Sequence, residues 1–288
     1  MKLLGISLDC HDSNFSYFDG NVVRYFKNER FEQIKHYHHH NHQQWKIDIQ
    51  EQFDVDVEEF DEIAIISTPF CSNLPESAEF FPTINYNEHF NAACPVHRVR
   101  HHYAHALSLW PIADEIDISV VVDGYGDEGT SAAIFKNDET VWSMGYEESG
   151  SVGFSMSKLA FEFGIKSDSY DKTGIDSVGK LMGIQSYGNF DKCFYEEMIK
   201  YEVEDLSDIF DFNKWVQHKG SRLLAEHTTI DYVRTIHEVV GELLVKLFSR
   251  HANKNDRISY TGGCAQNVIW NTKLKEHFLR PKSTDPVS

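Results

Sequence analysis

Three closely spaced histidines are the strongest chemical signal in the sequence: His101, His102 and His105. The alanines and the leucine around them favour a helix and Pro111 ends it, so we expect a short helix over residues 101–110. On that helix His101 and His105 lie one turn apart on one face, where both imidazoles can reach a single metal ion. His102 then faces elsewhere. The alternative is a solvated or helix-capping histidine pair.

Two other polar segments contain groups that transfer protons or bind metals. The loop over residues 9–13 includes His11 and Asp12, which can accept, donate and position protons. An ordinary turn is the alternative. Residues 36–42 contain five histidines, which either bind a metal ion or form a solvated loop that picks up metal adventitiously.

Three glycine-containing segments could bind phosphate groups or a nucleotide. Residues 124–129 include three glycines, whose backbone N–H groups can approach phosphate oxygens, while the acidic neighbours would need a bridging cation. Lys180 lies among glycines in residues 179–188, otherwise expected to be a loop. Gly262 and Gly263 follow an expected strand, and backbone donors at a strand-to-helix turn favour a nucleotide.

The composition of the chain is that of a globular protein, whose helices and strands must position these residues. Of its 288 residues 41% are hydrophobic and 13% aromatic, enough for a sizeable core in one large or two smaller lobes. The net charge of -18, from 27 basic and 45 acidic residues, disfavours a nucleic-acid or anionic-membrane surface. The N-terminal segment has no run typical of a signal peptide or membrane span, and the five scattered cysteines fit reduced thiols. We therefore expect a cytoplasmic protein.

A repeated pattern of strands organises the chain. Strands are expected over residues 4–9, 14–18 and 22–26, and again over 118–123, 130–135 and 140–145. In each set the first strand ends in an aspartate and is followed by a polar loop. The repeat predicts two similar lobes, residues 1–113 and 114–288, whose Asp12 and Asp123 loops face a shared cleft for a small anionic ligand. Chance similarity of two hairpins is the alternative.

The second lobe also shows helical periodicity. Helices are expected over residues 151–163, 230–250 and 264–278, with a strand over 257–260 before the last of them. The connection over residues 68–91 is long and is expected to cover the site or a sheet edge.

Four motifs occur in the order found in a known family. They cover residues 101–106, 121–130, 179–188 and 262–267, and shorter matches at residues 5–7, 11–13 and 29–31 keep the same order. Together they resemble the carbamoyltransferases of nodulation-factor and antibiotic biosynthesis over nearly the whole chain. The resemblance implies an α/β chain with the duplicated actin-like ATPase, or ribonuclease H-like, fold, in which two lobes each have a mixed sheet flanked by helices.

The resemblance also implies a reaction and a site. A carbamoyl group would pass from carbamoyl-adenylate to the hydroxyl group of a small-molecule or sugar acceptor, with release of AMP. His101 and His105 match ligands of a divalent metal ion, Fe²⁺ by preference, and His11 and Asp12 lie where the acceptor hydroxyl would be positioned or deprotonated. The residues assigned to ATP or carbamoyl-adenylate are Asp123, Gly124, Gly126, Lys180, Gly262, Gly263 and Asn267.

The sequence departs from the family pattern at its end. Family members continue with a strand, a metal-binding aspartate and a YrdC-like domain that makes carbamoyl-adenylate, whereas residues 279–288 are polar. We therefore expect the third metal ligand beyond Ser288 or, failing that, at Asp127, and slow carbamoyl transfer by this chain alone. We also expect an open sheet edge beside the strand at Tyr260, which a separate YrdC-like domain or a second copy of the chain would cover.

Two other functions stay open. One is a sugar-kinase-like phosphotransferase, which would use ATP and Mg²⁺ and has little need for a histidine pair. The other is a catalytically incomplete nucleotide-binding remnant, which only an activity assay can distinguish from an active carbamoyltransferase.

Overall fold

The computed structural model describes residues 1–7, 12–37, 44–67, 92–111, 113, 115–165, 175–220, 228–253 and 255–278. These residues form two compact units. The first contains Met1–Ala104 and Gly126–Glu128, and the second contains the other described residues from His105 on. The division falls within the histidine helix, and the lobe boundary expected after residue 113 stays a prediction.

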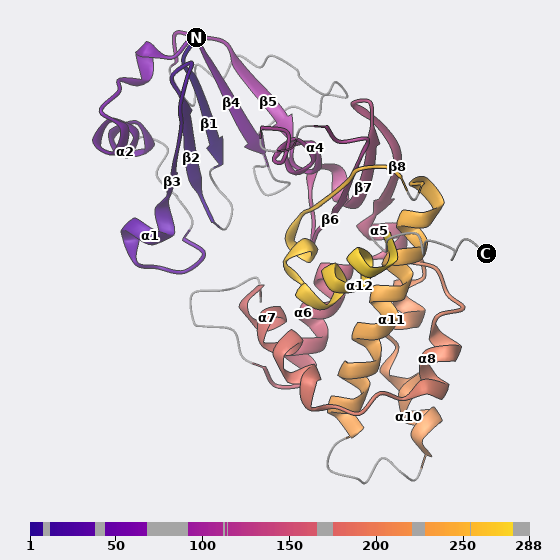
Figure 1. Ribbon diagram of the computed structural model, residues 1–288. Helices are drawn as coiled ribbons and strands as arrows, with labels where there is room; N and C mark the ends of the chain where they lie inside the picture. Colours follow the sequence, from indigo (N-terminus) through magenta and orange to yellow (C-terminus); the bar gives the residue numbers. More distant parts are fainter. Residues whose placement is uncertain are drawn as a thin grey trace, which may run out of the picture. The chain divides into compact units, whose positions relative to one another are not determined.

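The first unit is built on a five-stranded mixed sheet (Figure 1). Its elements are β1 (Leu3–Ser7), β2 (Asn14–Phe18), β3 (Val23–Lys27), α1 (Asn28–Glu32), α2 (Gln44–Phe53), the short 3₁₀ helix η1 (Val57–Glu59), β4 (Glu62–Ser67) and β5 (Val96–Arg100), followed by α4 (His101–Leu107). The strand order is β3-β2-β1-β4-β5, and β4 pairs in parallel with both β1 and β5. Since β5 runs directly into α4, the sheet fixes where the histidine helix starts.

Alternation of apolar residues decides which face of this sheet is buried. Leu4 and Ile6 of β1 point to the same side, and they pack with Trp45 and Ile49 of α2 in one apolar cluster. All four side chains are almost fully buried. Period-two alternation on the strand and period-3.6 spacing on the helix thus join α2 to the sheet.

The second unit repeats the strand arrangement of the first. Its strands are β6 (Ile118–Val122), β7 (Thr130–Lys136), β8 (Glu139–Gly145) and β9 (Ile258–Thr261), in the order β8-β7-β6-β9. As in the first sheet, an antiparallel meander is extended by a parallel strand that follows a long connection. The repeated strand unit expected from the sequence is therefore confirmed. In the part of the second unit that the structure describes, β9 lies at the sheet edge.

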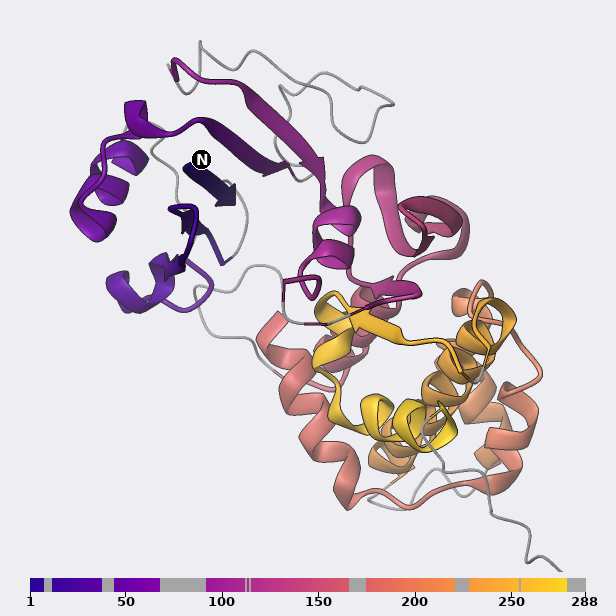
Figure 2. The same cartoon turned by 45° about the horizontal axis from the view of Figure 1, so that its top comes forward.

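Helices follow the meander of the second unit. They are α5 (Tyr146–Ser149), α6 (Val152–Glu162), α7 (Ile175–Ile184), α8 (Lys192–Met198), α9 (Leu206–Ile209), α10 (Phe212–Lys219), α11 (Thr228–His251) and α12 (Val268–Phe278), with 3₁₀ helices η2 (Asp127–Gly129), η3 (Gln185–Tyr187) and η5 (Gly263–Gln266). Helix α11 is the longest of these and packs along α12, as Figure 2 shows. Apolar residues of α11 such as Val233, Ile236 and Val240 lie in the core that also buries Ile118 of β6. No helix in the described ranges has the length and apolar character needed to cross a membrane.

Two local expectations from the sequence are wrong. Lys180 lies in the helix α7 and not in a loop, because the apolar spacing around Leu181 buries one face of that segment. The helix expected over residues 264–278 is divided into η5 and α12 at Asn267, whose extended backbone interrupts it. The expected connection over residues 68–91 lies outside the described residues.

A buried histidine in α11 makes the stability of the second unit pH-dependent. Burial lowers the pKa of His237 to about 4, although its ring Nδ1 is hydrogen-bonded to the carbonyl oxygen of Val233 at 2.8 Å. The unfolded chain takes up this proton near pH 6.5, so stability present above that pH is lost as the pH falls toward 4. We expect this one group to lower the free energy of unfolding by about 2 kcal/mol between pH 8 and pH 5.

Urea unfolding at the two pH values measures this effect. The variant His237→Gln should show a smaller decrease than the wild type, whereas His277→Gln, which replaces an exposed histidine of α12, should keep the full decrease. An identical pH dependence in wild type and His237→Gln would contradict the assignment.

Candidate metal and nucleotide site

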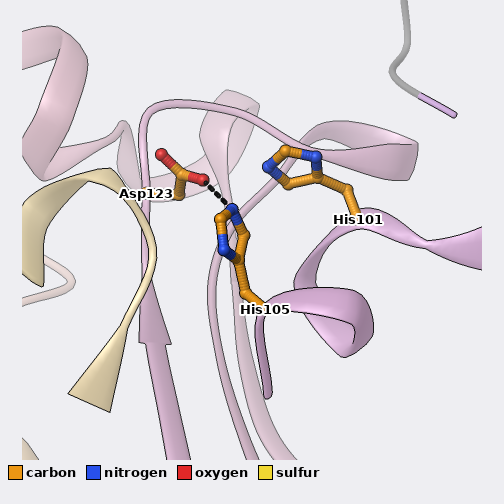
Figure 3. Close-up of side chains that lie close together, drawn as sticks. All are labelled: His101, His105 and Asp123. Carbon is orange, nitrogen blue, oxygen red and sulfur yellow. Dashed lines mark ion pairs between the residues drawn. The ribbon is translucent and has the colours of Figure 1, made fainter. Parts of the chain in front are cut away.

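Helix α4 presents two histidines one turn apart, as the sequence predicts. Tyr103 and Ala106 are buried and anchor the helix, while His101 and His105 are only partly buried. The third member of the group is Asp123: one ligand atom from each of the three side chains lies within 4.8 Å of the others. Figure 3 shows the two imidazoles and the carboxylate gathered at one point.

Asp123 is held from two sides. It directly follows β6, whose residues are all buried, so the strand delivers the carboxylate to the end of the sheet. Its Oδ2 lies 3.0 Å from Nε2 of His105. Its Oδ1 accepts hydrogen bonds from the backbone N–H of Gly124 at 2.7 Å and of Gly263 at 3.1 Å. Because Oδ1 is engaged in this way, Oδ2 is fixed toward the histidine.

Asp127 holds the start of the histidine helix. Its Oδ2 accepts a hydrogen bond from the backbone N–H of His101 at 2.5 Å, and its Oδ1 accepts one from Nη2 of Arg98 at 3.2 Å. The carboxylate is 5% exposed and the arginine side chain 12%. A carboxylate at this point accepts a hydrogen bond from an N–H group that has no partner within the helix. Its negative charge also interacts favourably with the positive N-terminal end of the helix dipole. The structure thus gives Asp127 a capping role, and the carboxylate beside the histidines is Asp123.

Two further expectations concern neighbours of this group. His102 is buried, and its ring lies beside Gly126. A Cβ atom at Gly126 would lie 2.3 Å from Nδ1 of His102, so only glycine fits there. Gly126 therefore has a packing role in the structure, and its assignment to a nucleotide stays a prediction.

The glycine pair after β9 is required by close approach of the backbone. Gly262 has a φ of 91°, a conformation that side chains other than glycine rarely adopt. A Cβ atom at Gly263 would lie 2.8 Å from Oδ1 of Asp123. Burial raises the pKa of the neighbouring Cys264 thiol, so it stays protonated near neutral pH. The pair brings a backbone donor to Asp123.

The two remaining residues assigned to the nucleotide differ in their surroundings. Asn267 caps α12, since its Oδ1 accepts hydrogen bonds from the backbone N–H of Ile269 and Trp270. It is almost fully buried. Lys180 lies on an exposed position of α7. A role for either in nucleotide binding stays a prediction.

The first unit contains a second polar group around Asp12. Nζ of Lys27 lies 3.0 Å from Oδ1 of Asp12 and 2.9 Å from Oε1 of Glu29, and Nδ1 of His36 lies 3.1 Å from Oδ2 of Asp12. Burial alone would lower the pKa of Lys27, but hydrogen bonds to Glu29 and Asp12 outweigh it and raise that pKa. Asp12, Glu29 and His36 lie close enough together to hold a cation, but the ammonium group of Lys27 lies between the two carboxylates. His11 and residues 38–42 lie outside the described residues.

The pairing of Arg98 with Asp127 yields a stability prediction. Removing one partner of a buried ion pair leaves the other poorly compensated, so we expect Asp127→Ala to lower the free energy of unfolding by about 3 kcal/mol. Glu162→Ala breaks an exposed pair with Lys158 and should cost less than about 1 kcal/mol.

Urea unfolding of Arg98→Met, Asp127→Ala and the double variant tests the pairing. The double variant should lose much less stability than the two single variants added together. Additive losses would show that the two side chains act independently.

Comparisons with known proteins agree with this architecture. A family described as Carbamoyltransferase N-terminus matches residues 84–279. Among solved structures, the activator of the 2-hydroxyisocaproyl-CoA dehydratase from Clostridium difficile, with bound ADPNP, is similar with a TM-score of 0.55 and 11% identity, over 97% of this chain and 86% of that one. This likeness concerns the fold alone. No curated protein matches the chain.

Two other solved structures are more distantly similar. Full-length HypF in a phosphate- and nucleotide-bound form has 14% identity and a TM-score of 0.47, over 96% of this chain and 42% of HypF. A putative N-acetylmannosamine kinase from Listeria monocytogenes has 12% identity and a TM-score of 0.40, over 97% of this chain and 89% of the kinase.

The fold and the family are therefore both established. Two mixed sheets of matching strand order, flanked by helices, constitute the duplicated actin-like ATPase fold expected from the sequence. The family match covers well over half of the residues, including α4, the Asp123 loop and the glycine pair after β9. The chain belongs to the carbamoyltransferase N-terminus family.

Proposed function

We propose that this chain transfers a carbamoyl group from carbamoyl-adenylate to a hydroxyl group of a small-molecule or sugar acceptor and releases AMP. The observation that carries the proposal is the group of His101, His105 and Asp123 beside the glycine-lined turn at Gly263. It combines metal-ligating side chains with backbone N–H groups in a chain of the carbamoyltransferase family. A YrdC-like domain would supply the carbamoyl-adenylate.

The donor set fits a divalent transition metal. Two imidazoles and one carboxylate are the ligands typical of non-haem Fe²⁺ sites with open positions, and they also suit Zn²⁺. Asp123 is kept in place by two backbone N–H groups, and His101 by the cap at Asp127. When bound, such an ion supplies a Lewis acid that polarises a phosphate or carbonyl oxygen.

The chain's own residues would perform the remaining steps. Backbone N–H groups of the turn at Gly262 would bind the nucleotide and keep it oriented, apart from that of Gly263, which donates to Asp123. Asp12 is held in place by its pairs with Lys27 and His36. Asp12 would therefore orient the acceptor hydroxyl, and His11 would take the proton from it.

A metal-binding prediction follows. Purified protein dialysed anaerobically against Fe²⁺ should retain one ion per chain, because two imidazoles and a carboxylate converge at α4. The double variant His101→Ala/His105→Ala should lose it, whereas His36→Ala should retain it. Elemental analysis after dialysis gives the stoichiometry. Loss of the ion from the His36→Ala variant, with the α4 double variant unchanged, would place the site at Asp12.

The reaction itself is tested by product analysis. With enzyme in excess over carbamoyl-adenylate, even slow transfer gives detectable AMP, and release should require both the α4 histidines and an acceptor alcohol. Formation of ADP and a phosphorylated acceptor from ATP would instead favour a sugar-kinase-like phosphotransferase. Nucleotide binding with neither product would favour a non-catalytic nucleotide-binding chain.

A further inference from the structure

The first turn of α6 presses directly on the backbone around Asp123. A Cβ atom placed on Gly153 would lie 2.9 Å from Cα of Gly124, 3.0 Å from its N and 3.2 Å from the carbonyl carbon of Asp123. These neighbours are backbone atoms, which cannot move aside as a flexible side chain can. The loop and the helix can therefore come this close only because residue 153 is glycine.

The same turn holds the loop through a hydrogen bond. Ser151 is 1% exposed and caps α6, since its Oγ accepts a hydrogen bond from the backbone N–H of Phe154 at 3.2 Å. The Ser151 hydroxyl in turn donates to the carbonyl oxygen of Asp123 at 3.0 Å. One side chain thus fixes both the start of the helix and the residue that carries the carboxylate.

We infer that Ser151 and Gly153 are positioning residues for the Asp123 carboxylate. They clamp the backbone of Asp123 and Gly124 on one side, while the N–H groups of Gly124 and Gly263 hold Oδ1 on the other. Oδ2 then has little freedom to leave its place 3.0 Å from Nε2 of His105.

The expected effect of these two residues on metal binding rests on the proposed function. If Asp123 is a metal ligand, residues that orient it should change metal affinity about 10- to 100-fold without touching the ion. Neither residue carries an ionisable group, so their effect comes from geometry alone. A residue that only stabilises α6 would instead change global stability and leave the carboxylate in place.

The variant Gly153→Ala tests the inference, with Gly183→Ala as the matched control. Both add one methyl group to a helix, but a Cβ atom at Gly183 has no neighbour within 4 Å. In metal-free protein, NMR hydrogen exchange of the Gly124 and Gly263 amides should become at least tenfold faster in Gly153→Ala and remain unchanged in Gly183→Ala. Exchange in the α11 core reports global stability and separates a local change from unfolding.

Ser151→Ala is the second variant, for the case that Gly153→Ala does not fold. It should accelerate exchange of the same two amides. With Co²⁺ as the probe, it should also change the visible absorption spectrum of the bound ion and weaken Co²⁺ binding about tenfold. Ser186→Ala, which removes a hydroxyl donating to Gly183, should do neither. Unchanged amide exchange in a folded variant at 151 or 153 would overturn the inference. Failure of the wild type to bind Co²⁺ would contradict the proposed function but would leave the exchange result to decide the positioning role.

Discussion

The carboxylate of Asp123 joins three segments of the second unit that are far apart in the sequence. It follows β6, accepts hydrogen bonds from the N–H groups of Gly124 and Gly263, and pairs with His105 of α4. Each of these contacts needs the others, because a shift of the turn at Gly263 would release Oδ1 and free Oδ2 from the imidazole. The backbone around the site is accordingly rich in glycine, which lets segments approach more closely than side chains would permit.

The sheet explains why the carboxylate is where it is. The second sheet repeats the order of the first, with a parallel strand added to an antiparallel meander, and its strand β6 is buried along its whole length. A buried strand can end in a charged residue only where the chain leaves the apolar layer, and Asp123 occupies that point. The loop after β6 also carries Asp127, which caps α4. One loop therefore both provides the carboxylate and orients the helix that bears the histidines.

Much of this could be predicted from sequence because it depends on local patterns. The recurring order of apolar strand, aspartate and polar loop predicts the repeated strands, and the i, i+4 spacing of His101 and His105 depends only on the helix. Contacts between segments distant in sequence could not be predicted: nothing in the spacing indicates that Arg98 pairs with Asp127 or that Gly153 packs on Gly124. The family resemblance assigns Asp123 to the nucleotide, and only the fold brings its carboxylate to the histidines. The position of Lys180 cannot be predicted in the same way, because glycines within a helix such as α7 resemble a loop in sequence.

The central claim is that His101, His105 and Asp123 form one metal site. X-ray absorption spectroscopy of the Zn²⁺-loaded protein tests it most directly, because the scattering of imidazole rings differs from that of carboxylate oxygens. The account predicts a first shell with two imidazole nitrogens and a carboxylate oxygen, and loss or lengthening of the oxygen contribution in the variant Asp123→Asn. A spectrum without two imidazoles, or one that Asp123→Asn leaves unchanged, would contradict the account.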